Sequence, residues 1–203
     1  MARLDRNFYC RDTLTVAREI IGTYLVRSWN GKLLVCRITE AEAYIGATDK
    51  ACHAYGGRCT ERTKTLYAAP GTSYVYLIYG MHHCLNFVTE EDGIAAAVLI
   101  RGAIPVAGID EIAYQRFGVN ENNLTAYQRK NFLNGPGKLC RGLAITKAHN
   151  ALPLDNDQLW LCDELPELLL APYRPIVHTG KRIGIDYAEE AIDFPWRFYE
   201  SQS

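Results

Sequence analysis

Two carboxylates and one aromatic residue occupy alternate positions after an apolar stretch, and these residue types could do chemistry. The stretch covers residues 33–38, and it is followed by Glu40, Glu42 and Tyr44. Side chains two residues apart on a strand point to the same face of the sheet, so the three would share one face. A carboxylate can activate water and an aromatic ring can stack on a flat ligand. The spacing predicts one wall of a pocket, although a solvent-exposed strand edge with scattered charge explains the segment alone at least as well.

A second group of aromatic residues lies downstream. Tyr74 and Tyr76 would share one face of a strand, and Tyr79 stands directly before Gly80, where a hairpin turn is expected. A large ring at such a turn projects into solvent. An exposed tip that includes Tyr79 and Met81 is costly for solubility and is typical of an apolar wedge. A hairpin tip folded back on the core is the alternative.

The composition is that of an ordinary globular protein. The chain has 203 residues, 48% of them hydrophobic and 22% charged, so a single domain with a substantial core is expected. Charged residues interrupt the N-terminal segment, which excludes a signal peptide there. The longest apolar run, residues 94–100, is too short to cross a bilayer. We therefore expect a soluble, cytoplasmic protein with no membrane partner.

The seven cysteines do not predict a metal site or a disulfide framework. Their number is odd and no Cys-x-x-Cys pair occurs. A cluster of Cys52, His53 and Cys59 is conceivable as a metal site, but its spacing does not favour one. We expect no metal and no external cofactor.

Charge is distributed unevenly along the chain. Residues 1–150 carry 18 Lys and Arg against 13 Asp and Glu, a net charge of +5. Residues 151–203 carry 4 against 10, a net charge of −6, which leaves −1 for the whole chain. One basic and one acidic surface are compatible with a phosphate backbone bound on one side. Chance unevenness explains the charges alone equally well.

Strand-like and helix-like patterns place these residues in an α+β fold. Strands are expected at 23–28, 32–41, 73–78, 84–88, 95–100, 159–161 and 176–185, the fifth of them ending at Arg101. Helices are expected at 13–21, 49–55, 109–117, 125–133 and 137–145. Strands come first and most helices later, so we expect a single compact domain over residues 1–203. Its curved, mostly antiparallel sheet would be surrounded by helices and carry a protruding β-hairpin.

Several of these motifs, taken together, closely resemble the alkyladenine (3-methyladenine) DNA glycosylase family. The resemblance runs in order from about Leu4 to Tyr199 and rests on segments 37–44, 53–58, 70–81, 85–86, 98–101 and 135–140. It implies a metal-independent hydrolase that removes damaged purines from double-stranded DNA during base excision repair. It also implies a monomer, which in a bacterial-type cell would associate with the nucleoid when acting.

The resemblance assigns catalysis to three positions. Glu42 matches the catalytic base, and Arg101 and the backbone carbonyl near Ile183 match further contacts of the attacking water. Arg101 beside Glu42 would favour the ionised carboxylate that a general base requires. For Glu40 we prefer a structural ion pair.

Further positions match the family's base pocket. Tyr44, His53 and Tyr76 correspond to its walls, and Asn86 corresponds to the residue that excludes normal guanine. Electron-rich rings on both faces suit alkylated purines, which often carry positive charge. Asn86 could instead be a buried residue that merely ties down the returning strand.

The hairpin tip matches the part of the family that enters DNA. Tyr79 corresponds to the side chain that fills the gap left by an extruded nucleotide, and Met81 flanks it. His82 and His83 stand where a bulkier aromatic residue is expected, and Gly137 stands where serine is common. These departures leave the groove contacts and one phosphate contact open.

Two other classes of function remain open from the residues. A module that binds lesions without catalysis would keep the aromatic pocket and the wedge but would not need Glu42. A hydrolase of free nucleosides would explain the carboxylates but not the exposed tip at Tyr79. The sequence does not rank methylated purines, hypoxanthine and ethenoadenine as substrates.

Overall fold

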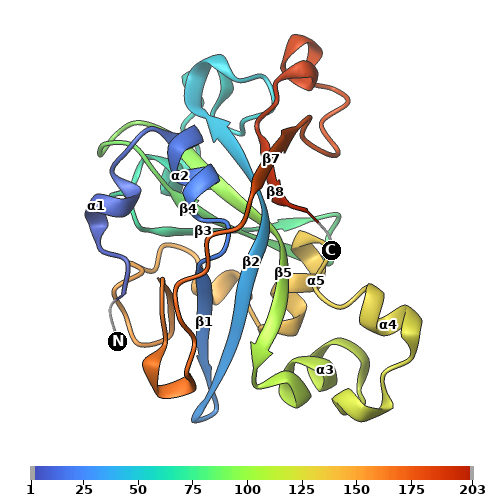
Figure 1. Cartoon of the computed structure of the whole chain (residues 1–203). Helices are drawn as coiled ribbons and strands as arrows, with labels where there is room; N and C mark the ends of the chain where they lie inside the picture. Colours follow the sequence, from blue (N-terminus) through green and yellow to red (C-terminus); the bar gives the residue numbers. More distant parts are fainter. Residues whose placement is uncertain (1–2, 202–203) are drawn as a thin grey trace.

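A single antiparallel sheet forms the frame of the protein (Figure 1), whose computed structural model describes residues 3–201. Six strands follow one another in the order β3-β4-β5-β2-β1-β6, and β8 joins the edge of β2 and pairs with β7. The strands are β1 (Tyr24–Trp29), β2 (Lys32–Ile45), β3 (Ser73–Ile78), β4 (His82–Val88), β5 (Ala96–Ala107), β6 (Leu159–Cys162), β7 (Val177–Gly180) and β8 (Arg197–Glu200). The predicted α+β fold with a curved antiparallel sheet and a protruding hairpin is confirmed.

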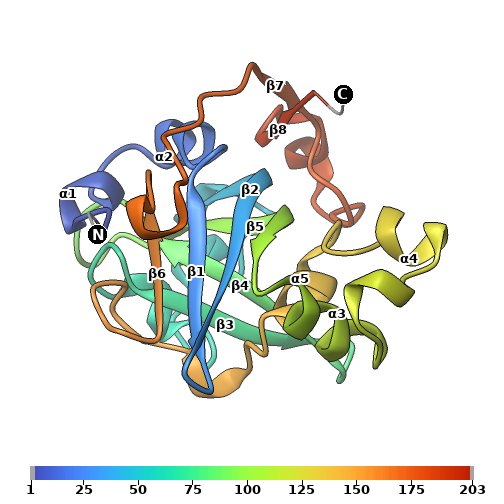
Figure 2. The same ribbon diagram turned by 60° about the horizontal axis from the view of Figure 1, so that its bottom comes forward.

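Helices lie at two opposite sides of the sheet in both views (Figures 1 and 2). They are α1 (Arg6–Tyr9) and α2 (Thr13–Glu19) on one side, and α3 (Ile109–Phe117), α4 (Ala126–Lys130) and α5 (Pro136–Gly142) on the other. Val16, Ile112 and Leu139 from these helices are buried in one cluster with sheet residues. No helix within residues 3–201 has the length and apolar character that crossing a membrane would require.

β2 is the strand that carries the predicted carboxylates into the molecule. It is fourteen residues long and pairs with β1, β5 and β8. Its register against β5 shifts on both sides of Glu40, and such irregularities bend a strand and increase its twist. Ala41 and Ala43 are fully buried on the face opposite Glu42. The end of β2 is therefore covered on both faces, which excludes the exposed strand edge as an explanation.

Three predicted elements differ most in the structure. The helix expected at 49–55 is absent, and the Asp49 carboxylate accepts hydrogen bonds there from the Ile45 and Ala51 amides. The chain there forms only turns between the 3₁₀ segments Gly46–Thr48 and Tyr55–Gly57. β5 does not end at Arg101 but continues to Ala107 along β2.

The strand expected at 176–185 is confined to Val177–Gly180, and the reason is an ion pair. Two residues beyond β7, the Arg182 side chain turns inward to Asp49, at 2.6 and 2.8 Å. The chain after β7 therefore becomes irregular and lies beside the end of β2.

Candidate active site

A cavity of about 610 Å³ opens between the β3–β4 hairpin, the end of β2 and the segment 183–187. Of the residues predicted for the site, seven line it: Tyr44, His53, Tyr76, Tyr79, Asn86, Arg101 and Ile183. Glu42 lies directly behind the wall, and Met81 stands outside on the hairpin. The structure thus brings together residues that are far apart in the sequence.

The Glu42 carboxylate is fully buried, and both of its oxygens have partners. The Tyr44 hydroxyl donates to Oε2 at 2.8 Å, as expected if the two side chains share one face of β2. The backbone N–H of Ile183 donates to Oε1 at 2.8 Å, and the Arg101 Nε lies 3.4 Å from the same oxygen. All three partners line the cavity, so Glu42 is in contact with its wall.

Burial and the neighbours of Glu42 act on its pKa in opposite directions. Burial raises the pKa, whereas Arg101, the Ile183 N–H and the Tyr44 hydroxyl lower it. Burial is the largest contribution, and the pKa lies above its ordinary value of 4.5. Arg101 lowers the pKa of Glu42, as expected, but burial raises it by more. The carboxylate is therefore a stronger base than an exposed glutamate.

Arg101 bridges both carboxylates of β2. Its Nε lies 3.3 Å from Glu40 Oε1, and Arg197 of β8 donates to the same oxygen at 3.0 Å. Glu40 therefore forms ion pairs with two arginines, which agrees with the structural role preferred for it. This network fixes the Arg101 guanidinium against the cavity.

The backbone of Ile183 approaches Glu42 in a way that the sequence did not suggest. The predicted contact was its carbonyl, on an attacking water, whereas the contact in the structure is the N–H donating to the carboxylate. Segment 183–187 is thus tied to the end of β2.

The aromatic walls come from β3 and from the turn after β2. His53 and Tyr76 meet edge to face with ring centroids 4.6 Å apart, and Tyr74 lies 5.2 Å from Tyr76. The Tyr74 hydroxyl and His53 Nδ1 are hydrogen-bonded at 3.0 Å. Burial and the charge of Arg62 lower the pKa of His53 to about 4, so its ring is neutral at physiological pH. Tyr74 was not predicted for the site, although its alternation with Tyr76 contained the signal.

Burial also acts on the phenols. It raises the pKa values of Tyr44 and Tyr76 well above their ordinary 10. Both hydroxyls, already protonated at neutral pH with an ordinary pKa, thus remain hydrogen-bond donors in alkaline solution as well.

Asn86 both lines the cavity and ties two strands together. It is buried, and its Nδ2 donates to the carbonyl of Tyr74, its register partner on β3, at 3.0 Å. This bond is the one expected if Asn86 only holds the returning strand. Because the residue also lines the cavity, both interpretations of Asn86 fit the geometry.

A buried ion pair supports the pocket from behind. Arg182 and Asp49 are both fully buried and pair through two hydrogen bonds, and Arg182 also donates to the carbonyl of Ala43 at 2.9 Å. The guanidinium carbon lies 4.7 Å from the Tyr44 ring centroid. Because the partners are 133 residues apart, no local pattern indicated this pair.

The hairpin tip holds its aromatic residue in an unusual conformation. Tyr79 and Gly80 form a two-residue loop with φ angles of 52° and 69°, closed by Met81 N–H donating to Ile78 O at 3.2 Å. Positive φ is rare for a bulky residue and costs about 1–3 kcal/mol. Tyr79 is 82% exposed and Met81 70% exposed. The strained, solvent-facing tip excludes a hairpin folded back on the core.

The two departures noted beside the wedge lie in contact with each other. A Cβ atom at position 137 would lie 3.0 Å from His82 Cβ and 3.1 Å from its Cγ. Glycine at the start of α5 therefore leaves room for His82 in this position.

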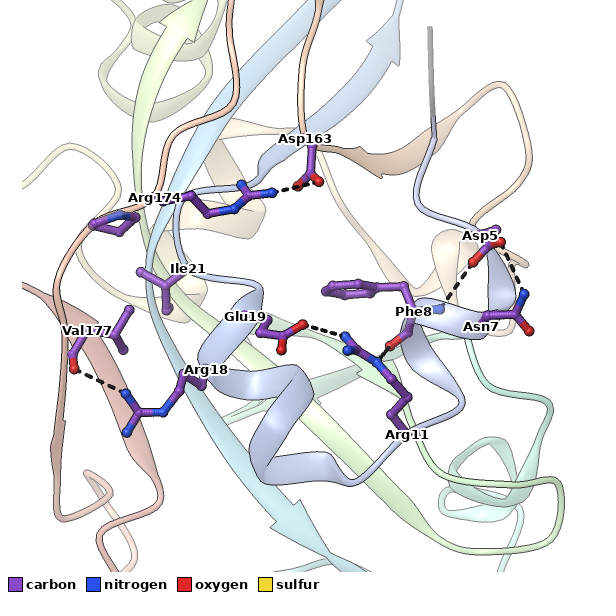
Figure 3. Close-up of a pocket in the computed structure, with 11 residues that line it drawn as sticks. Asp5, Asn7, Phe8, Arg11, Arg18, Glu19, Ile21, Asp163, Arg174 and Val177 are labelled. Carbon is purple, nitrogen blue, oxygen red and sulfur yellow. Dashed lines mark hydrogen bonds and ion pairs between the residues drawn. The ribbon is translucent and has the colours of Figure 1, made fainter.

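A second cavity of about 710 Å³ lies beside α1, α2 and the segment before β7. Four of its charged side chains pair with one another: Arg11 with Glu19 and Arg174 with Asp163, each at 2.8 Å (Figure 3). Arg18 donates to the Val177 carbonyl at 3.4 Å. Among residues 3–201, Phe8 is the only aromatic residue in its lining, so these residues offer no stacked walls for a flat ligand.

Metal-binding residues do not cluster in the described part of the chain. Among residues 3–201 no group of three or more His, Cys, Asp or Glu could hold a metal ion. Cys52 is buried and His53 lines the cavity, whereas Cys59 is exposed.

The fold and the site together show an α+β domain with an aromatic cavity, a buried carboxylate behind its wall and a projecting aromatic hairpin. Residues 7–203 match the sequence model of the methylpurine-DNA glycosylase family, so the chain belongs to that family. It is a DNA glycosylase of base excision repair, a hydrolase of N-glycosidic bonds whose substrate is DNA.

Similar proteins from several bacteria match over nearly their whole lengths. A protein of Clostridium perfringens (strain SM101) is 54% identical over 198 residues, which cover 97% of this chain and 95% of that protein. One from Alkaliphilus oremlandii is 49% identical over 97% and 95% of the two chains, and one from Bacillus cereus (strain AH820) is 48% identical over 95% and 93%. Each is named "Putative 3-methyladenine DNA glycosylase".

Proposed function

We propose that this DNA glycosylase removes damaged purines, 3-methyladenine among them, from double-stranded DNA by using Glu42 as the general base. The observation that carries the proposal is the fully buried Glu42 carboxylate, whose partners form the wall of an aromatic cavity next to the exposed Tyr79. Residues 1–203 act as one domain and as a monomer, and in the bacterial cell the protein associates with the nucleoid when it acts.

Access to the glycosidic bond comes first. A purine inside a duplex hides that bond, so the nucleotide must be extruded at a cost of a few kcal/mol. Tyr79 enters the gap from the minor groove and offsets part of this cost, with Met81 beside it. The outward position of Tyr79 supports this role, because no rearrangement of the hairpin is needed to expose the ring.

Recognition follows in the cavity. The extruded base stacks against Tyr44, His53 and Tyr76, and stacking of this kind is worth about 1–3 kcal/mol per base. Aromatic faces bind a cationic alkylated purine better than a neutral one. The volume of about 610 Å³ leaves space for a purine and part of its sugar.

Hydrolysis then needs a water molecule and a base. Glu42 removes a proton from the water, whose oxygen bonds to C1′ of the deoxyribose while the C1′–N bond breaks. The electron pair of the broken bond leaves with the purine, and a cationic purine departs as a neutral molecule. Arg101 and the carbonyl of Ile183 hold the water. No metal or external cofactor takes part.

Asn86 limits the reaction to damaged or deaminated bases. Normal guanine carries an exocyclic amino group at C2 that adenine and hypoxanthine lack. Asn86 clashes with that group or leaves it unpaired, and an unpaired buried donor costs about 1–3 kcal/mol. The buried position of Asn86 in the cavity lining supports this role.

The direct test measures release of free base from duplexes that each carry one lesion, with EDTA present, and from the matching free nucleosides. We expect release from duplex DNA and none from nucleosides. If the protein bound the lesion duplexes but released no base from any of them, it would be a lesion-binding protein. Release from nucleosides alone would favour a small-molecule hydrolase. Loss of activity in EDTA that a divalent ion restores would overturn the metal-independent mechanism.

A further inference from the structure

The segment that closes the cavity presents a carboxylate that the proposed mechanism does not use. Asp186 lines the cavity and is exposed at its rim. Asp186 and Tyr187 are the central residues of a turn in which the Ala188 N–H donates to the Ile185 carbonyl at 2.8 Å. The Asp186 side chain forms no hydrogen bond and no ion pair with any other residue between 3 and 201. A role in capping this turn is therefore not observed.

Neighbouring residues hold Asp186 in place on both sides. Ile183 is bonded to Glu42 through its N–H, and Ile185 is buried against Ala51. The Tyr187 hydroxyl reaches the Ala51 carbonyl at 3.5 Å. These contacts anchor the chain on both sides of Asp186.

Two arginines at the cavity walls differ in how well their positive charges are balanced. Arg101 is balanced by Glu40 and Glu42, with which it pairs. The Arg62 guanidinium lies 5.6 Å from the Tyr76 ring centroid and adds positive charge at the aromatic wall. Asp186 is an acidic residue in the lining of the same cavity. A free carboxylate at a mouth that faces DNA also repels phosphates, so it weakens general DNA binding unless it contributes to recognition of the base.

We propose that Asp186 is a specificity-determining residue that makes the pocket favour positively charged purines over neutral ones. The inference rests on the proposed function of the cavity and deepens it. A purine alkylated at N7 or N3 carries a positive charge until the glycosidic bond breaks. The Asp186 carboxylate attracts that charge electrostatically as the base enters the cavity. Hypoxanthine and other neutral purines gain nothing from the same carboxylate.

The test compares Asp186→Asn with the unaltered protein on two duplexes of identical sequence. One carries 3-methyladenine, which is cationic, and the other carries hypoxanthine, which is neutral, and neither base has the C2 amino group that Asn86 is proposed to exclude; single-turnover release is measured over a range of enzyme concentrations. We expect the specificity for 3-methyladenine relative to hypoxanthine to fall roughly three- to tenfold, the size expected for one partly screened charge. The difference should shrink as salt is added.

Two further variants make the result specific. Glu190→Gln removes the same charge outside the cavity lining, and Lys50 keeps its ion pair with Glu189. This control should leave the ratio unchanged, and Asp186→Glu should retain most of the preference. An Asp186→Asn protein that releases hypoxanthine normally with an unaltered ratio would overturn the role of Asp186 but not the proposed function. Failure of the unaltered protein to release either base would instead overturn the proposed function.

Discussion

Two cavities in the described part of the protein, residues 3–201, lie beside similar charged groups in very different surroundings. Each places a glutamate beside an arginine: Glu19 pairs with Arg11 in the larger cavity, and Glu42 with Arg101 in the smaller one. The Glu19 side chain is half exposed, whereas that of Glu42 is fully buried. Water screens the charges of the exposed pair, Glu19 and Arg11. Glu42 and Arg101 are shielded from water, so burial controls the pKa of Glu42.

Burial of the charged groups, and not the size of a cavity, therefore distinguishes the cavity that we propose as the active site. The larger cavity holds charged groups that satisfy one another at the surface (Figure 3). The smaller one holds a carboxylate with a raised pKa behind aromatic walls and beside an exposed tyrosine. Substitutions in the two regions should consequently have very different effects.

The largest effect on stability is expected from Asp49→Ala, behind the smaller cavity. The variant leaves Arg182 buried without its ion-pair partner, and breaking a buried pair in this way costs about 3–5 kcal/mol. Chemical denaturation of the variant measures the loss. Asp163→Ala, which breaks the exposed pair with Arg174 in the larger cavity, should cost about 0–1 kcal/mol. Equal losses in both variants would contradict the contrast between the two regions.

Tyr79→Ser should weaken base release from a well-paired lesion duplex by roughly ten- to a hundredfold. Extruding the nucleotide costs a few kcal/mol of stacking energy, and Tyr79 is proposed to offset part of it. Without the ring, the extruded state becomes less favourable by that part. A lesion placed in an unpaired bulge needs less help, so its release should change much less. Single-turnover rates on the two duplexes give this comparison. Equal loss on both, or no loss on the paired duplex, would show that Tyr79 is not the wedge.

Asn86→Ser should raise excision of guanine, particularly mispaired guanine, relative to hypoxanthine. The smaller side chain removes the obstacle to the C2 amino group, and a penalty of about 1–3 kcal/mol corresponds to roughly a 5- to 150-fold change in the ratio. Because Asn86 also bonds the Tyr74 carbonyl, the unfolding transition is recorded in parallel. If the folded variant excised guanine and hypoxanthine in an unchanged ratio, the role of Asn86 would be limited to holding β3 and β4 together.

The smallest effect is a pH dependence of stability that belongs to Glu42. Its pKa is raised in the folded protein, so the folded state binds the proton more tightly than the unfolded chain does. Stabilisation by this proton is therefore present below the unfolded pKa and is lost as the pH rises through the folded pKa. The unfolding free energy of the unaltered protein minus that of Glu42→Gln should increase on going from pH 7 to pH 5. A decrease would show that Arg101 outweighs burial.

Several features of the fold and site could be predicted from the sequence because they follow from local periodicity. The two-residue period of a strand placed Glu42 and Tyr44 on one face, and their hydroxyl–carboxylate bond confirms it. A tyrosine before Gly80 indicated an exposed tip, and the tip is exposed. Motif resemblance supplied the partners that periodicity could not, such as Asn86.

Other features depend on contacts between distant segments, which no local pattern encodes. The pair of Asp49 with Arg182 joins two such segments, which the structure shows as turns and as the chain beyond a short strand where a helix and a longer strand were expected. The same contact brings the Ile183 N–H to Glu42, where the sequence had suggested only a carbonyl. Asp186 had no sequence signal, because an acidic residue in a loop is usually a solvated surface residue.

The central claim is that Glu42 in the smaller cavity, and no group of the larger one, is the catalytic base. The measurement that tests it most directly is single-turnover release of a damaged purine from duplex DNA by Glu42→Gln and by Glu19→Gln. We expect Glu42→Gln to lose about 10²- to 10⁴-fold in rate while its lesion binding stays within about tenfold. Glu19→Gln, the matched change at the surface, should stay within about twofold of the unaltered protein. A Glu42→Gln protein that kept more than about a tenth of the rate would contradict the claim, because a general base contributes at least about a hundredfold.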